Sequence, residues 1–457
     1  MTRSLVLATF ALASVAVSAQ DEGHATRPGE IEGRPAGRQT STLQARIDAT
    51  PAGGTLVVDS GSYEGDLVID KPLRLIGRGR PRLVGSGTGS VVRVRAPEVL
   101  IEGFDIDGRR GGDLGRDTSG VHVAARNVTV RDCRISDAIF GVYLREADAA
   151  VVERCSVRGI AGREPGEKGS GIHVWNTTGF RILDNTILDV RDGLYVQSSS
   201  HGLVKGNRAS ELRYGLHYMF SDDNVFEDNV FENGAAGAAL MYSKRIAFRR
   251  NQFLRNRGFA SVGLLLKACD DVVAEDNLIA DNARGIFIEG SYRNLIRRNV
   301  IAGSDIAIVL YDSSSGNRFL GNSFVGNLSP LTLVGRRTDT VFSGNYYSDN
   351  HEPDLDGDGI ADRAYRLSSV FDHLRGNLIA ADLLAQSLAA SALGAAEQAF
   401  PVLRAVPVED QRALARPPAL PDVPTPEPRR RVAGLAGISG SALALSLGFL
   451  TLLRGRA

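Results

Sequence analysis

Two methionines and two histidines are the residues of this chain whose types and spacing are best suited to bind a metal. Met219 and Met241 lie 22 residues apart, and His217 precedes Met219 by two positions. Thioether sulfur beside imidazole nitrogen suits Cu(I) far better than zinc, magnesium or calcium. His173 lies 44 residues before His217 and is a candidate for a second or transient copper site. The alternative is an exposed apolar strip that contacts a protein partner.

A second candidate metal site is an acidic, Gly-rich stretch near the C-terminal third of the chain. Asp354, Asp356 and Asp358 stand at alternate positions, as in the first half of an EF-hand calcium loop. Asp362 occupies the ninth position of such a loop, whereas the twelfth, which is normally acidic, is Tyr365. The stretch predicts a structural Ca²⁺ site, with a polar capping turn as the alternative.

These residues are positioned by a repeat of about 22 residues that runs through most of the chain. Its two motifs, apolar-x-x-Asn-x-apolar and Gly-apolar-x-apolar, alternate at the same period. The asparagines are Asn185, Asn207, Asn229, Asn251, Asn277, Asn299, Asn322 and Asn345, and the glycines are Gly120, Gly141, Gly171, Gly193, Gly215, Gly237, Gly263 and Gly285. The segments alternate with period 2, which is typical of β-strands, and the period is too short for a helical pair.

We therefore predict an all-β fold, a right-handed parallel β-helix over residues 41–380. Successive coils of such a helix lie about 4.8 Å apart, so that like positions form columns. Stacked asparagines are expected to hydrogen-bond to one another along their column.

Strand alternation places the apolar residues of the Gly motif inside and the residues between them outside. The first outward column reads His122, Tyr143, His173, Tyr195, His217, Ala239, Leu265 and Phe287, and the second reads Ala124, Arg145, Trp175, Gln197, Met219, Met241, Lys267 and Glu289. In this frame Met219 and Met241 are neighbours on adjacent coils and share a face with His217.

Two of the three cysteines stand where other coils have asparagine. Cys133 and Cys155 are one coil apart, a Cα separation compatible with a disulfide in an exported protein. Two buried free thiols are the alternative, because cysteine is a common core residue. Cys269 is predicted to be a lone core thiol.

Three coils carry extra residues, at 109–119, 159–170 and 256–262. All three insertions lie between the Asn-type motif and the next Gly motif, so they should project from one corner of the helix. Insertions on one face of a solenoid often mark its binding face. Neutral growth of loops at a tolerant corner is the competing explanation.

The two ends of the chain are predicted to direct it out of the cytoplasm. Residues 1–19 have the pattern of a secretory signal peptide, followed by a flexible lead-in over 20–40. A Pro/Ala-rich linker, 381–431, precedes an uncharged segment, 432–453, that is long enough for a transmembrane helix. We expect a periplasmic body anchored in the inner membrane; a C-terminal sorting signal that is later removed is the alternative for the last segment.

Several classes of function are disfavoured by composition. Lys+Arg and Asp+Glu number 53 each and no basic stripe stands out, so nucleic-acid binding is not expected. Polysaccharide enzymes need clustered carboxylates or Ca²⁺ with a basic residue. The acidic pairs Asp222–Asp223 and Asp270–Asp271 are more simply explained as solvated turn residues. We therefore do not expect an enzyme, and a β-helix protein that binds or modifies polysaccharides is the alternative.

Two stretches resemble the NosD family, periplasmic proteins that serve the maturation of nitrous oxide reductase. Residues 213–224 (RYGLHYMFSDDN) with 237–243 (GAALMYS) are similar to its signature region, and 345–349 (NYYSD) with 354–359 (DLDGDG) to its closing motif. The resemblance spans about 40–380. Residues 350–353 (NHEP) depart from the Gly- and Tyr-rich pattern of the family, which weakens any inference about calcium.

The resemblance implies a copper-related role rather than hydrolysis. Family members work with an ABC transporter, made of a permease and an ATPase, and with a copper chaperone lipoprotein. Together they support assembly of the copper–sulfur centre of nitrous oxide reductase. The resemblance does not identify the metal-binding residues. The predicted copper site therefore depends only on the positions of these residues in the two outward columns. We expect a rigid platform that holds Cu(I) briefly between chaperone and reductase, with a metal-free structural adaptor as the alternative.

Overall fold

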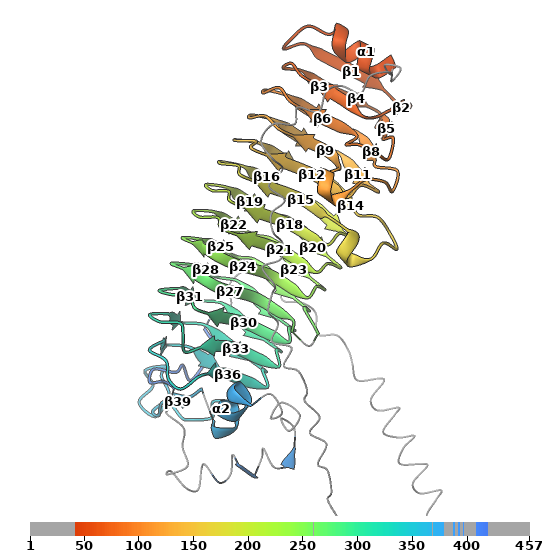
Figure 1. Cartoon of the computed structure of the whole chain (residues 1–457). Helices are drawn as coiled ribbons and strands as arrows, with labels where there is room; N and C mark the ends of the chain where they lie inside the picture. Colours follow the sequence, from red (N-terminus) through yellow and green to blue (C-terminus); the bar gives the residue numbers. More distant parts are fainter. Residues whose placement is uncertain are drawn as a thin grey trace, which may run out of the picture.

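The chain forms a long right-handed parallel β-solenoid of about 13 coils (Figure 1). The computed structural model describes residues 42–258, 260–367, 369–378, 387–388, 392–393, 396 and 408–418. The predicted β-helix is thus confirmed. The segments predicted as signal peptide (1–19), lead-in (20–40) and transmembrane helix (432–453) lie outside the described residues. Within the described residues, no helix has the length and apolar character needed to cross a bilayer.

Three sheets, A, B and C, form the sides of the solenoid, and a coil contributes one strand to each. Their strand pairs are parallel, except for the last pair of sheet A, which is antiparallel. Sheet A contains β1 (Thr55–Asp59), β4 (Arg74–Arg78), β7 (Leu100–Glu102), β10 (Thr129–Arg131), β13 (Val151–Glu153), β16 (Arg181–Leu183), β19 (Leu203–Lys205), β22 (Val225–Glu227), β25 (Ala247–Arg249), β28 (Val273–Glu275), β31 (Leu295–Arg297), β34 (Arg318–Leu320), β37 (Val341–Ser343), β40 (Glu409–Asp410) and β39 (Tyr365–Arg366). Sheet B contains β2 (Ser62–Glu64), β5 (Arg82–Val84), β8 (Asp105–Asp107), β11 (Arg134–Ser136), β14 (Ser156–Arg158), β17 (Thr186–Leu188), β20 (Arg208–Ser210), β23 (Val230–Glu232), β26 (Gln252–Leu254), β29 (Leu278–Ala280), β32 (Val300–Ala302), β35 (Ser323–Val325) and β38 (Tyr346–Tyr347). Sheet C contains β3 (Leu67–Ile69), β6 (Val92–Val94), β9 (Ser119–Val123), β12 (Phe140–Arg145), β15 (Ser170–Trp175), β18 (Asp192–Gln197), β21 (Tyr214–Met219), β24 (Ala236–Lys244), β27 (Val262–Asp270), β30 (Arg284–Glu289), β33 (Ile306–Tyr311) and β36 (Ser329–Val334).

The interior is filled by columns of like side chains, because each residue meets its counterpart in the next coil. In the three-residue strands of sheet A the central residue points inward, as Val130 and Val152 do, and both are fully buried. Farther along the same column, the rings of Phe226 and Phe248 stack with their centroids 4.8 Å apart. Such stacks give each coil an apolar contact with both neighbours and fix the register of the columns.

The predicted asparagine column is present and fully hydrogen-bonded. The side-chain amide of Asn229 donates to Asn251 Oδ1 and to the carbonyl of Val204, both at 2.9 Å. Its own Oδ1 accepts the backbone N–H and the side-chain amide of Asn207, each at 3.0 Å. Cys155 adjoins the column as predicted, since its backbone N–H donates to Asn185 Oδ1 at 2.9 Å. The ladder ties the turns between sheets A and B along the solenoid.

All three cysteines are buried free thiols in the structure. Cys133 and Cys155 lie between paired residues of adjacent coils, as the column predicted, and no bond joins their sulfur atoms. Burial raises the pKa of Cys269 to about 12, which leaves that thiol protonated and unreactive. The structure therefore has the second of the two arrangements considered for Cys133 and Cys155.

The three insertions project from one corner, as expected, since each connects a strand of sheet B to the following strand of sheet C. The first contains a 3₁₀ turn, η1 (Leu114–Arg116), and the second contains η2 (Pro165–Glu167). These two insertions contact each other, because the guanidinium of Arg110 donates to the carbonyl of Ala161. They form one continuous cover beside sheet C.

Short helices and a returning segment close the two ends of the solenoid. At the N-terminal end α1 (Thr42–Ala49) buries Leu43 and Ile47. At the other end α2 (Val370–Asn377) packs on β36, and residues 408–418 return to the last coil. Asp410 is fully buried there and accepts the backbone N–H and the side-chain amide of Asn345 at 3.0 and 2.8 Å. This corrects the linker assignment, since part of 381–431 terminates the asparagine ladder.

Replacing Asp410 with alanine is expected to lower the free energy of unfolding by about 3 kcal/mol. The reason is that buried amide donors of Asn345 lose their acceptor, at about 1–3 kcal/mol for each unsatisfied group. Urea unfolding of the full chain measures the effect. Glu409→Ala is the control, because this neighbouring side chain is only half-buried. Equal stability of the two variants would contradict a capping role for Asp410.

Candidate functional site

The candidate copper ligands lie on sheet C in the predicted register. Met219 on β21 pairs with Met241 on β24, and His217 stands two residues before Met219 on the same face. Leu216 and Tyr218, which alternate with them, point into the core and are fully buried. The two thioethers and one imidazole therefore share an outward strip on two adjacent coils, which we call the copper strip (His217, Met219 and Met241).

His173 does not join this group. Its register partner is Tyr195 of β18, and Tyr195 in turn pairs with His217. The ring centroids of His173 and Tyr195 lie 4.4 Å apart, and those of Tyr195 and His217 lie 4.7 Å apart. The phenol ring thus separates the two imidazoles, so the structure leaves His173 outside the copper strip.

The copper strip faces outward but is largely shielded from water. His217 is 6% exposed and Met241 is 4% exposed, whereas Met219 is partly exposed. The hydroxyl of Tyr195 lies 4.0 Å from the Met219 sulfur. Met219 is therefore the candidate ligand that reaches solvent. His217 and Met241 are buried, so little water competes with them for a bound ion.

Two charged residues that the sequence did not reveal hold His217 in place. Its Nδ1 lies 3.3 Å from Asp192 Oδ2, and Arg213 donates to the same carboxylate at 2.9 and 2.7 Å. Burial raises the pKa of Asp192, but the hydrogen bonds from His217 and Arg213 outweigh it and leave the pKa below its ordinary value. With Nδ1 turned toward Asp192, Nε2 is the ring nitrogen available to a metal.

The lowered pKa of Asp192 predicts a loss of stability in acid. A carboxyl group with a depressed native pKa stabilises the fold above its unfolded pKa of 3.8, and this contribution disappears as the pH falls through the native pKa. Asp192→Asn should be less stable than wild type at about pH 6, by about 2 kcal/mol, with a smaller loss on acidification. Urea unfolding at several pH values tests this. Parallel curves for both proteins would contradict it.

The other two histidines of the column, His122 and His173, lie at the end that the insertions adjoin and are half-buried. Burial lowers the pKa of His122 and of His173 to about 3, so both imidazoles are neutral. Leu114 and Ile160, which belong to the first two insertions, pack with Tyr143 and Trp175 in a small apolar cluster outside the main core. The insertions therefore pack against this end of the column, away from the copper strip.

The acidic loop gathers its first three carboxylates. Ligand atoms of Asp354, Asp356 and Asp358 all lie within 4.8 Å of one another, which fits an oxygen-ligated cation. Asp362 instead accepts the backbone N–H of Leu355 at 3.0 Å. Tyr365 donates its hydroxyl to Asp349 at 2.9 Å and so belongs to another contact. The structure brings together three of the four carboxylates predicted for calcium.

The two acidic pairs have basic partners that the sequence did not indicate. Arg245 forms ion pairs with both Asp222 and Asp223, at 3.2 and 2.7 Å. Arg293 does the same for Asp270 and Asp271 in a later coil. Each arginine lies at the turn of the coil that follows its acidic pair. These carboxylates are therefore held as salt-bridged turn residues.

The protein is a parallel β-solenoid that places two thioethers and an imidazole on one outward face. The sequence model of the family described as "Periplasmic copper-binding protein (NosD)" matches residues 156–352, which contain the copper strip and His173. Two relatives, from Stutzerimonas stutzeri and Pseudomonas aeruginosa, are each named "Probable ABC transporter binding protein NosD". Both are 30% identical over 379 residues, which cover 79% of this chain and 86% and 88% of the relatives. The chain belongs to the NosD family.

Solved structures reproduce the solenoid at low sequence identity. The A-module of mannuronan C-5 epimerase AlgE4 from Azotobacter vinelandii superposes with a TM-score of 0.55 at 17% identity, covering 65% of this chain and 94% of the module. At this identity the likeness concerns the fold alone.

Proposed function

We propose that this protein is a periplasmic accessory factor for maturation of the copper–sulfur centre of nitrous oxide reductase. It docks on the permease of an ABC transporter, receives Cu(I) from a copper chaperone lipoprotein and passes it to the reductase. ATP hydrolysis belongs to the transporter's ATPase, and this chain catalyses no reaction. The description of its family as periplasmic and copper-binding, and the names of its relatives, support this role.

The observation that carries the proposal is the register of the copper strip. It aligns two soft sulfur donors on adjacent coils beside an imidazole whose other nitrogen is directed to Asp192. Thioether and imidazole ligands add no negative charge to bound Cu(I), whereas thiolates do, so the ion is held less tightly than thiolates would hold it. Partial exposure of Met219 gives the ion a path in and out. Such a site suits a cargo that must be released.

The test is the copper content of nitrous oxide reductase assembled in cells whose only NosD protein is this full chain. The double variant Met219→Leu/Met241→Leu should yield reductase depleted in copper, while the same amount of variant protein remains in the periplasm. A deletion of the gene gives the lower limit. Full copper loading with the double variant would favour a metal-free adaptor over a copper carrier.

We propose further that residues 432–453 anchor the solenoid in the inner membrane, with the body on the periplasmic side. The uncharged composition of this segment and its flanking arginines support the proposal. Fractionation of cells that produce the full chain tests it. The protein should remain with membranes after a carbonate wash, and a chain that stops at residue 428 should not.

We propose that the acidic loop binds a structural Ca²⁺ ion through Asp354, Asp356 and Asp358. An ion that binds only the folded state at 100 times its Kd adds about 2.7 kcal/mol of stability. Saturating Ca²⁺ is therefore expected to raise the Tm by several degrees, and Asp356→Asn/Asp358→Asn should abolish the shift. A calorimetric scan with and without chelator measures it. An equal shift in the variant would rule out this loop.

A further inference from the structure

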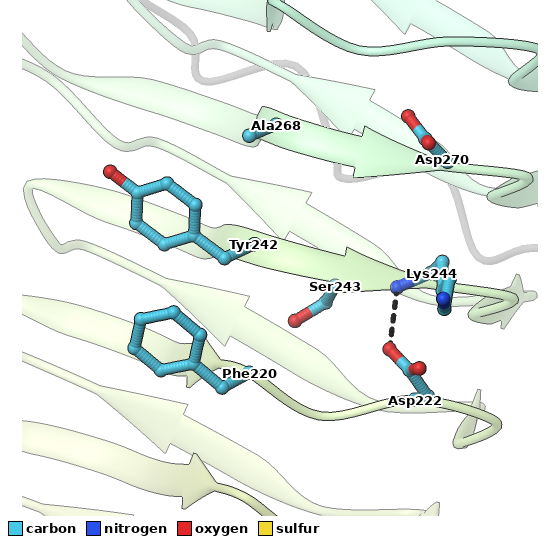
Figure 2. Close-up of a pocket in the computed structure, with 7 residues that line it drawn as sticks. All are labelled: Phe220, Asp222, Tyr242, Ser243, Lys244, Ala268 and Asp270. Atoms are coloured by element: carbon cyan, nitrogen blue, oxygen red, sulfur yellow. Dashed lines mark hydrogen bonds between the residues drawn. The ribbon is translucent and has the colours of Figure 1, made fainter.

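The two methionines of the copper strip differ in their exposure to solvent. Met241 is 4% exposed, whereas Met219 is partly exposed. Figure 2 shows the residues that follow them, Phe220 and Tyr242, on adjacent strands, and both of these rings are exposed. The surface at the ends of the two strands is therefore open to water. The difference between the methionines must arise from their neighbours within the column.

Met241 is flanked by a side chain whose position is fixed by an ion pair. It lies between Met219 and Lys267 on the adjacent coils. The Nζ of Lys267 lies 3.3 Å from Glu289 Oε2, and this contact keeps the alkyl stem of the lysine in the column. Oxidants convert an accessible thioether to a sulfoxide. The copper strip therefore combines one sulfur that is open to oxidation with one that is protected.

A phenol hydroxyl lies where it can stabilise a sulfoxide at Met219. The Tyr195 hydroxyl is 4.0 Å from the Met219 sulfur and donates to Gln197 Oε1 at 2.8 Å. A thioether sulfur is a weak hydrogen-bond acceptor, whereas the oxygen of a sulfoxide is polar and accepts strongly. An oxygen atom bonded to the Met219 sulfur can therefore accept a hydrogen bond from this hydroxyl.

We propose that Met219 is a modification site, at which a peroxide oxidises the thioether to a sulfoxide and thereby disables the copper strip. A sulfur lone pair attacks one peroxide oxygen, and the O–O bond breaks as the S–O bond forms. With hydrogen peroxide, the departing hydroxide takes up the proton of the transferred hydroxyl group and leaves as water. Sulfur is oxidised by two electrons and the peroxide is reduced.

The modification would change the kind of ligand that Met219 offers. A sulfoxide presents its oxygen, a hard donor, whereas Cu(I) prefers soft sulfur. His217 and Met241 remain, but they are the buried members of the strip. This inference rests on the proposed function, because the loss of Cu(I) binding has a meaning only if the strip holds the ion.

The first test is peroxide oxidation of the metal-free full chain, followed by peptide mass spectrometry. Hydrogen peroxide is the probe, and the gain of one oxygen atom is measured at each methionine over time. Met219 should be oxidised faster than Met241 by about tenfold or more, while circular dichroism shows that the fold is retained. Equal rates at the two residues, or an unreactive Met219, would overturn the inference.

The second test is the Cu(I) affinity of the oxidised protein, measured by competition with a chelator. Oxidation of wild type should weaken binding by about tenfold or more. Treatment with methionine sulfoxide reductases and a thiol reductant, which is removed before the titration, should restore the affinity. Met219→Leu should bind Cu(I) more weakly than wild type from the start, and peroxide should not weaken it further. Met241→Leu should still lose affinity on oxidation.

The outcomes separate this inference from the proposed function. Selective oxidation of Met219 without a change in Cu(I) affinity would overturn the inference and leave the proposed function standing. A peroxide-dependent loss of affinity in Met219→Leu would also overturn it, because another residue would then be responsible. If untreated wild type binds no Cu(I), the proposed function is itself wrong and the inference fails with it.

Discussion

Replacing Asn229 with alanine is expected to lower the free energy of unfolding by about 4 kcal/mol. Its side chain forms four hydrogen bonds of 2.9–3.0 Å that join three successive coils. Alanine leaves the backbone N–H and side-chain amide of Asn207, the carbonyl of Val204 and Asn251 Oδ1 without these partners in a fully buried position. Each buried, unsatisfied group costs about 1–3 kcal/mol, and partial relaxation reduces their sum.

Urea unfolding followed by circular dichroism measures this loss. Lys244→Ala is the control, since Lys244 ends β24 in the same coil with an exposed side chain. It should change the stability by less than about 0.5 kcal/mol. Because a solenoid is stabilised by nearest-neighbour contacts, Asn229→Ala should also lower the cooperativity of unfolding. A loss no larger than that of the control would mean that the ladder contributes little.

The second large effect concerns copper. Met219→Leu/Met241→Leu is expected to weaken Cu(I) binding by about 100-fold or more, which corresponds to about 2.7 kcal/mol. Leucine preserves the apolar volume of methionine, so the strip should remain folded while both sulfur donors are lost. Competition with a chelator of known affinity gives the Kd. His217→Gln should weaken binding through loss of the ring nitrogen while leaving both thioethers in place.

Buried cysteines are the obvious competing source of sulfur in such a titration. Cys133 and Cys155 are 1% and 2% exposed, and both belong to coils that precede the coils of the copper strip. Cys133→Ala/Cys155→Ala is therefore expected to retain the wild-type Kd. If this variant loses Cu(I) binding and the methionine variant keeps it, the ion binds to thiols and the copper strip is wrongly assigned.

The sequence predicted the columns because a solenoid repeats its geometry. Asn207 and Asn229 are one period of 22 residues apart, and Met219 and Met241 have the same separation. Their pairing could therefore be predicted, and the structure has that register. The same logic predicted a shared corner for the three insertions. It also predicted that Cys155 would adjoin the asparagine column.

What the sequence could not predict depends on contacts outside the period. Asp410 joins the ladder 65 residues after Asn345, from a segment whose Pro/Ala composition indicated a linker. Asp192 begins β18 and Arg213 directly precedes β21, at positions where charged residues are usually solvated, and the burial of Asp192 beside His217 and Arg213 could not be inferred from the repeat. The order of the column places Tyr195 between His173 and His217. The sequence did not show that its ring would stand between the two imidazole rings.

The most direct test of a copper strip is X-ray absorption at the copper edge of the full chain loaded with one equivalent of Cu(I). The ligand shell should contain sulfur together with imidazole nitrogen. Its sulfur contribution should vanish in Met219→Leu/Met241→Leu and persist in Cys133→Ala/Cys155→Ala. A shell of nitrogen and oxygen only, or sulfur that disappears with the cysteines instead, would contradict the account.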